Sequence, residues 1–245
     1  MEIEQSGSLS PEQKLLLAER LQNARQAIAE AARSAGRQPE EITLIGVSKF
    51  FPPWVAQAAA EIGLADLGEN RVQEMLEKIK WLENLQLLPN WHLIGTLQKN
   101  KVRQVIGRTH LIHSADSLPL LEEISQRSIA ANLVTDLLLQ VNTAGEETKH
   151  GFTPQEIRAA AEYAMQAAGI RLRGLMTMAP LFANADDSLP VFDQTFELFC
   201  KTARDAGNPA SFDVLSMGMS LDFRQAIACG STHVRLGTAI FGPRL

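Results

Sequence analysis

Lys49 follows the apolar stretch TLIGVS and precedes Phe50, in a pattern typical of a strand that is buried on both faces. An ammonium group at the inner end of such a strand loses hydration, and this loss favours the neutral amine. A neutral amine is the nucleophile that forms a Schiff base with an aldehyde. The other interpretation is a side chain that reaches solvent at the end of the strand, and the pattern alone favours neither.

The stretch LSMGMSLD, residues 215–222, combines glycine and hydroxyl groups with a predicted helix start. A short strand precedes Gly218, and Ser220 is predicted as the N-cap of a helix with Asp222 in its first turn. Backbone N–H groups and hydroxyls at a helix N-terminus can bind an anion. Taken alone, a plain loop followed by a capped helix is the better interpretation.

The stretch VRLGTAIFG, residues 234–242, offers a second set of groups suited to an anion. Arg235 supplies a fixed cation, Gly237 lets a ligand approach the backbone, and Thr238 offers a hydroxyl at the start of a final short helix. Each stretch is a weak signal by itself. Together they predict one phosphate site.

Apolar runs of strand length alternate with amphipathic segments of helix length along the chain. A capping box at SPEQ, Ser10 to Gln13, opens a predicted helix that continues to Ala35. The predicted strands are TLIGVS, ADLGEN, WHLIGT, THLIHS, DLLLQVN, RLRGLMTM, FDVLSMG and HVRLGTAIF. The predicted helices between them are 53–62, 71–85, 97–106, 118–130, 154–168, 189–206 and 220–229.

This alternation predicts an α/β fold, a single (β/α)₈ TIM barrel with an extra N-terminal helix. The alternative is an open doubly wound sheet, which would be expected to carry a GxGxxG turn that this sequence lacks. In the barrel, the functional residues follow the carboxyl ends of the strands, and the loops after strands seven and eight often bind phosphate. On the predicted helix 71–85, Glu74 and Lys78 are expected to form an i,i+4 pair.

Composition excludes several classes of protein. The net charge of -5, with scattered basic residues, argues against a nucleic-acid partner. Without a secretory leader or an apolar run of about 18 residues, we expect a cytoplasmic protein with no membrane partner. The two cysteines and five histidines lack metal-ligand spacing, so no metal site is predicted and His92 is interpreted as a core histidine. We expect one domain over residues 1–245, with residues 1–9 as a flexible leader.

A phosphate that also carries an aldehyde, set beside a reactive lysine, describes pyridoxal 5′-phosphate (PLP). The sequence therefore suggests that Lys49 holds this cofactor as a Schiff base. The polar loop GEETKHG, residues 145–151, places Lys149 and His150 at the same face of the predicted barrel. A solvated loop is the simpler interpretation of that pair.

The chain resembles the pyridoxal phosphate homeostasis proteins, the YggS or PROSC type, which are related to the barrel domain of alanine racemase. The resemblance is carried by GVSKF, LGENRVQE, WHLIGTLQKNK, LQVNTAGEETKHGF, GLMTMAP, LSMGMSLDF and VRLGTAIFG, in family order over nearly the whole chain. It implies that Lys49 carries the cofactor and that Arg235 lies by the ring nitrogen or by the phosphate. The further cofactor-binding residues that it implies are Asn70 at the ring and Ser216, Gly218, Ser220, Gly237 and Thr238 around the phosphate.

The resemblance implies a non-catalytic protein of PLP homeostasis that affects amino-acid and keto-acid balance, with apo PLP enzymes as expected recipients. The alternative is a weak amino-acid racemase or decarboxylase. Racemisation needs a proton donor on each face of the substrate, and in the related racemases a tyrosine from an added domain and a second subunit supplies the second. The chain's one tyrosine, Tyr163, falls on a predicted outer helix, and no second domain is expected after strand eight. We therefore expect a monomeric carrier.

Overall fold

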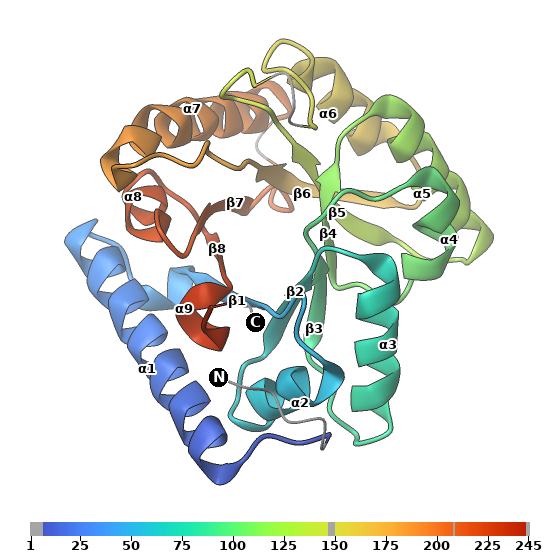
Figure 1. Cartoon of the computed structure of the whole chain (residues 1–245). Helices are drawn as coiled ribbons and strands as arrows, with labels where there is room; N and C mark the ends of the chain where they lie inside the picture. The colour runs from blue at the N-terminus through green and yellow to red at the C-terminus, as the bar shows by residue number, and fades with distance from the viewer. Residues whose placement is uncertain (1–6, 147–149, 208, 244–245) are drawn as a thin grey trace.

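Eight parallel strands close into a barrel in the computed structural model, which describes residues 7–146, 150–207 and 209–243 (Figure 1). Each strand pairs with the next in sequence order, and β8 pairs with β1. The strands are β1 Thr43–Val47, β2 Asp66–Glu69, β3 Asn90–Leu93, β4 Leu111–Ala115, β5 Thr135–Gln140, β6 Ile170–Met176, β7 Val214–Met219 and β8 His233–Leu236. The predicted (β/α)₈ barrel is confirmed.

Helices connect successive strands and form the outer layer of the barrel (Figure 1). The α-helices are α1 Pro11–Ser34, α2 Pro53–Glu61, α3 Val72–Glu83, α4 Val102–Val105, α5 Leu118–Ala130, α6 Ile157–Gln166, α7 Leu189–Asp205, α8 Phe223–Ala228 and α9 Thr238–Phe241. Short 3₁₀ turns lie at Pro39–Glu41, Lys99–Lys101 and Ala185–Ser188. Among the residues described, no helix has both the length and the apolar character needed to cross a membrane.

The extra N-terminal helix α1 lies outside the barrel and packs against α8 and α9 (Figure 1). It begins with the predicted capping box, in which Gln13 N donates to Ser10 Oγ at 3.2 Å and Ser10 N donates to Gln13 Oε1 at 2.8 Å. Leu9, inside the predicted leader, is buried in the core, so the leader is anchored at its end. Residues 1–6 of that leader lie outside the described residues.

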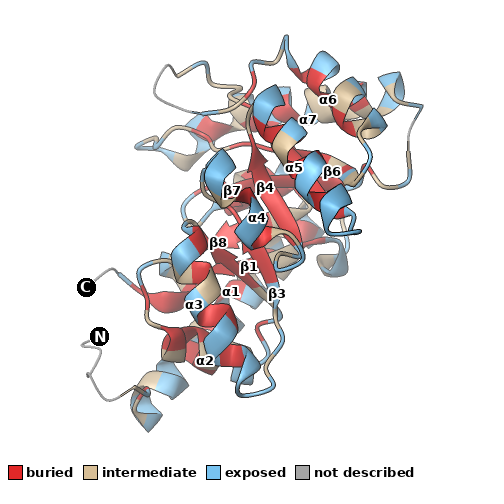
Figure 2. Ribbon diagram, turned by 90° about the vertical axis from the view of Figure 1, so that its right-hand side faces the viewer, coloured by how far each residue is buried: buried red, intermediate tan, exposed pale blue. Residues whose placement is uncertain are grey.

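Most of the core lies between the barrel wall and the helices. Figure 2 shows the strands buried and the helices exposed on their outer faces. A smaller apolar cluster of Leu111, Leu138, Met176 and Val214 is separate from this layer. Burial of apolar surface in the main layer is the largest favourable contribution to folding.

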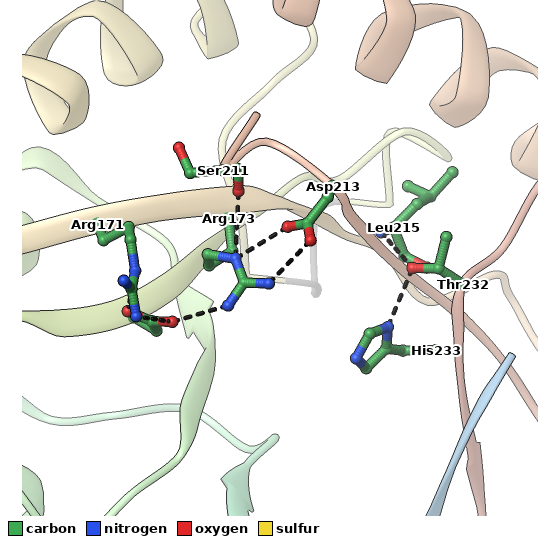
Figure 3. A network of polar contacts seen from close by, with 8 residues as sticks. Arg171, Arg173, Ser211, Asp213, Leu215, Thr232 and His233 are labelled. Atoms are coloured by element: carbon green, nitrogen blue, oxygen red, sulfur yellow. Dashed lines mark hydrogen bonds and ion pairs between the residues drawn. The ribbon is translucent and has the colours of Figure 1, made fainter. Parts of the chain in front are cut away.

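Charged side chains form a network at the amino ends of β5, β6 and β7. Arg173 donates to Asp213 and to Asp136, and Arg171 donates to both oxygens of Asp136 (Figure 3). Because Asp136 is nearly buried, its two arginine partners compensate a charge that burial would otherwise penalise. This network links neighbouring strands at the end of the barrel opposite the predicted site.

Three predicted helices differ from those observed. The segment 97–106 forms only a 3₁₀ turn and the single turn of α4. The Glu156 carboxylate accepts hydrogen bonds from Thr153 N and Oγ1, as a capping box predicts, but α6 starts later, at Ile157. Helix α8 starts at Phe223 with Asp222 as its N-cap, so the prediction of Ser220 as the N-cap is wrong.

The predicted pair of Glu74 with Lys78 is also wrong. Lys78 is 2% exposed and turns toward the barrel, where it pairs with Glu69 of β2. Glu74 instead forms an ion pair with Arg71 at 3.2 Å. A lysine drawn inward by a buried carboxylate cannot be recognised from the spacing of charges on its own helix.

Candidate active site

A cavity of about 650 Å³ opens at the carboxyl ends of the strands. Its lining comes from the residues that follow strands around the barrel, as expected for a functional site in this fold. Six of the eight predicted site residues line it: Lys49, Asn70, Ser220, Arg235, Gly237 and Thr238. The other two, Ser216 and Gly218, are not part of the lining, although both belong to β7 beside it.

The loop after β7 and the start of α9 meet at Ser220. Its Oγ accepts hydrogen bonds from Gly237 N at 3.2 Å and from Ala239 N at 3.4 Å. Two backbone donors thus converge on one oxygen position at the edge of the cavity. Such convergence suits an oxygen of an anionic group, with the Ser220 hydroxyl as a further partner.

Gly237 leaves room in the cavity that the packing of the protein does not require. A Cβ at this position would meet only Val47, at 3.5 Å and 3.7 Å, and the backbone φ of -103° is open to any residue. Glycine here therefore keeps space for a ligand beside the backbone. Gly218 differs, because its φ is +94° and a Cβ would lie 2.6 Å from Ala226 Cβ, so it serves the packing of α8 against β7.

Arg235 brings a buried positive charge to the inner part of the cavity. Its Nη1 donates to Ser216 Oγ at 2.6 Å and its Nη2 donates to the Thr177 carbonyl at 2.9 Å. Burial lowers the pKa of Arg235 to about 10, and Asp222 acts in the opposite direction. In the described part of the chain, no carboxylate forms an ion pair with Arg235. A buried cation without such a partner is suited to an acceptor on a bound ligand.

Lys49 follows β1, which pairs with β8, so it lies beside the strand that carries Arg235 and leads into Gly237. The next residue, Phe50, has a φ of +69°, a strained conformation for a bulky side chain. Strained backbone of this kind concentrates at functional sites.

A buried ion pair supports the chain just before Lys49. Ser48 Oγ donates to Glu69 Oε1 at 2.7 Å, and Lys78 Nζ donates to the Ser48 carbonyl at 2.8 Å and to the same Glu69 oxygen. Burial raises the pKa of Glu69, although Lys78 and Ser48 act to lower it. These contacts fix the backbone from which the Lys49 side chain projects.

Several lining residues were not predicted from the sequence. The loop after β6 contributes the apolar residues of PLFA, of which Leu181 is 85% exposed, and Leu221 adds a second exposed apolar side chain. The sequence signal for them is a group of apolar residues in a segment that is predicted as a loop. Of the two loop residues placed at this face from the sequence, His150 lines the cavity, with its Nδ1 3.7 Å from Asp116 Oδ2, whereas Lys149 lies outside the described residues.

Within the described ranges, no group of three or more His, Cys, Asp or Glu residues is placed to bind a metal ion. The arrangement instead combines an amine, a buried guanidinium and converging N–H donors.

Known proteins with the same sequence pattern identify the family. The sequence model of the family described as alanine racemase, N-terminal domain, matches residues 20–244. The pyridoxal phosphate homeostasis protein of Aquifex aeolicus is 42% identical over 226 residues, covering 92% of this chain and 97% of that protein. The protein of the same name from Pseudomonas aeruginosa is 38% identical over 228 residues, covering 93% and 96%.

A solved structure agrees with this assignment. PipY of Synechococcus elongatus, determined with PLP bound, has a TM-score of 0.80 and 33% identity, and the match covers 92% of this chain and 100% of PipY. The chain therefore belongs to the alanine racemase N-terminal domain family and, within it, to the pyridoxal phosphate homeostasis proteins.

Proposed function

We propose that this protein binds PLP at the barrel cavity and acts in PLP homeostasis as a non-catalytic carrier. The observation that carries the proposal is Arg235, a buried cation without an ion pair in the described chain, in the same cavity as Lys49 and the donors at Ser220. Two relatives at 42% and 38% identity are named as PLP homeostasis proteins, and PipY binds PLP. These likenesses support the same role here.

The residues of the cavity fit the parts of this cofactor. Lys49 and Asn70 both line the cavity, where Lys49 would bind the aldehyde carbon as a Schiff base and Asn70 would lie against the ring. Ser220, Gly237 and Thr238 would hold the phosphate, because two backbone N–H groups already converge on an oxygen there and Gly237 leaves space. When bound, PLP supplies an electrophilic carbonyl carbon and a ring that can withdraw electrons.

Ser216 and Gly218 contribute from behind this surface. Ser216 Oγ accepts the Arg235 hydrogen bond and so orients the guanidinium, and Gly218 lets α8 pack closely beneath the loop that carries Ser220. Both are proposed as supports of the cofactor site rather than as parts of the cavity wall.

In this proposal Arg235 would donate to the ring nitrogen of the cofactor. Arg235 lies within β8, two residues before Gly237, and is only 4% exposed, which suits the ring better than the phosphate at the loop after the strand. A guanidinium can donate but cannot accept, so it would keep a ring nitrogen beside it unprotonated. An unprotonated ring withdraws electrons weakly, which supports a carrier over a catalyst.

The alternative is weak racemase or decarboxylase activity. Tyr163, the one tyrosine of the chain, lies on α6 in the outer layer and does not line the cavity. This chain therefore brings no tyrosine to the second face of a bound amino acid, which supports the carrier. As a carrier, the protein would pass PLP to apo enzymes and so influence amino-acid and keto-acid balance.

The test compares the wild type with Lys49→Ala, and with Lys80→Ala on the exposed side of α3 as a matched lysine control. Each protein is incubated with PLP, freed of excess cofactor and examined by visible absorption. We expect a retained band in the wild type and in Lys80→Ala, and no band in Lys49→Ala. Borohydride reduction should then attach the cofactor mass to the peptide that contains Lys49.

Two results would count against the proposal. If the wild type retains no PLP, the proposed cofactor site is wrong. If Lys49→Ala keeps the band, the proposed Schiff base on Lys49 is wrong. Sustained turnover of an L- or D-amino acid that depends on Lys49 would contradict the carrier role and support the enzymatic alternative.

A further inference from the structure

A chain of four hydrogen bonds runs inward from Arg235. Arg235 Nη1 lies 2.6 Å from Ser216 Oγ, and Ser216 Oγ lies 2.9 Å from His113 Nδ1. His113 Nε2 lies 2.9 Å from His92 Nδ1, and His92 Nε2 lies 3.1 Å from Asp66 Oδ1. We call these five residues the interior chain.

The interior chain crosses the inside of the barrel. Its members come from β8, β7, β4, β3 and β2, so closure of the barrel is what brings them together. Ser216, His113, His92 and Arg235 are each between 0% and 4% exposed. Asp66 starts β2 and is half-buried, whereas Arg235 lines the cavity at the opposite end of the barrel. The chain thus joins the cavity to the amino-terminal end.

The direction of every hydrogen bond in the interior chain is fixed by its ends. A guanidinium only donates, so Ser216 Oγ accepts from Arg235 and its own hydrogen is left for His113 Nδ1. His113 must then carry its proton on Nε2 and donate to His92 Nδ1. His92 in turn carries its proton on Nε2 and donates to Asp66, and an ionised carboxylate only accepts.

The charge states agree with this order. Burial lowers the pKa of His113 well below its ordinary value and also lowers that of His92, so both rings are neutral. Burial acts to raise the pKa of Asp66, but hydrogen bonds from His92 and Asn90 outweigh it and the net pKa is lowered. A cation and an anion therefore terminate a row of three uncharged groups.

Each link of the row is a direct hydrogen bond between two side chains. The rings of His110 and His233 lie near His92, with centroids 5.4 Å and 6.4 Å away. His233 Nδ1 is instead 3.0 Å from Thr232 Oγ1 (Figure 3). A continuous network of this kind holds each of its members in one orientation, whereas removal of one link leaves a buried polar group unsatisfied.

We propose that His113, His92 and Asp66 are positioning residues that hold the Arg235 guanidinium in place for the ligand of the cavity. This inference rests on the proposed function for the identity of the ligand as PLP. The order of protons along the chain does not depend on the ligand. The two parts can therefore be tested separately.

The first experiment examines the protein without cofactor. ¹⁵N-histidine labelling and long-range ¹H–¹⁵N NMR near pH 7 report the protonated nitrogen of each ring. We expect His113 and His92 to be neutral with the proton on Nε2. A charged ring, or a proton on Nδ1 of either residue, would contradict the proposed order of hydrogen bonds in the interior chain, whether or not PLP binds.

The second experiment measures the dissociation constant for PLP in His113→Met and His113→Gln. The two side chains have similar volume, but glutamine keeps one acceptor for Ser216 and one donor for His92. We expect binding about tenfold weaker in His113→Met, because the support of a charged group is lost, and recovery to within about threefold in His113→Gln. Equal binding by the two variants would overturn a positioning role for His113.

A second pair of variants covers the case in which His113→Met does not fold. Asp66→Asn keeps an acceptor oxygen for His92 but removes the negative charge that ends the interior chain. Asp136→Asn removes a carboxylate at the same end of the barrel that is bonded to Arg171 and Arg173 instead. We expect PLP to bind Asp66→Asn at least about twofold more weakly than Asp136→Asn; equal affinity would overturn the link from Asp66 to the cavity. A wild type that binds no PLP would refute the proposed function, and the NMR result would still test the order of protons in the interior chain.

Discussion

Replacement of Lys78 by methionine should strongly destabilise the protein. The side chains of Lys78 and Glu69 are 3% and 0% exposed, and the lysine donates to both Glu69 and the Ser48 carbonyl. Glu69 Oε2 already has no hydrogen-bond partner within the described structure. Loss of the lysine leaves the buried carboxylate without a cation, and such a loss costs about 3–5 kcal/mol. For a chain of 245 residues this corresponds to a fall in Tm of roughly 6–10 °C.

The assay is denaturant and thermal unfolding of Lys78→Met beside Lys14→Met. Lys14 pairs with Glu61 at 3.4 Å on the surface, with 47% and 38% of the two side chains exposed. An exposed pair of this kind contributes about 1 kcal/mol or less. The same chemical change should therefore have a small effect at Lys14 and a large one at Lys78.

The pH dependence provides a second check. Burial raises the pKa of Glu69 in the folded protein, so stability linked to this group is present below its unfolded pKa and is lost as the pH rises through the folded value. Removal of the Lys78 charge should enlarge that loss. The difference between wild type and Lys78→Met should thus be greatest at pH 7 and shrink toward pH 4.5. A difference below about 1 kcal/mol at pH 7, or one that does not change with pH, would refute the reasoning.

Two further outcomes follow from the structure. Gly237→Ala should weaken PLP binding about tenfold without lowering Tm, because the added methyl group enters the cavity and strains no backbone; calorimetric titration and thermal unfolding check both halves, and unchanged affinity would contradict the role given to Gly237. Burial raises the pKa of Cys229 to about 12, so this thiol should not react with a disulfide reagent at pH 8 until the protein is unfolded. A count of two reactive thiols in the native protein would contradict its burial.

Sequence periodicity was sufficient for the architecture. Alternation of strand and helix patterns predicted the barrel, and the capping box at Ser10 predicted the start of α1 because both signals are local. The boundaries of α4, α6 and α8 were less accurate. At Ser220 the hydroxyl bonds to the start of α9 rather than to its own helix, and this tertiary contact has no sequence signature.

The site was only partly visible in the sequence. Lys49, Arg235 and Gly237 could be recognised because each follows or ends an apolar run in a fold whose functional end is known. His92 and His113 could not, since each alone is an ordinary core histidine. Their connection depends on which strands become neighbours when the barrel closes and on which side chains then point inward.

The pairing of β1 with β8 affects when the protein can fold during synthesis. Thr43 pairs with His233, so at about 5–20 residues per second the first strand waits roughly 10–40 s for its partner to be made. The apolar face of α1, which includes Leu17 and Leu21, waits equally long for α8 and α9. Through that interval the nascent chain exposes an unpaired strand edge and an uncovered helix, both of which favour aggregation. Chaperone protection at this stage should therefore affect yield more than the stability of the finished barrel does.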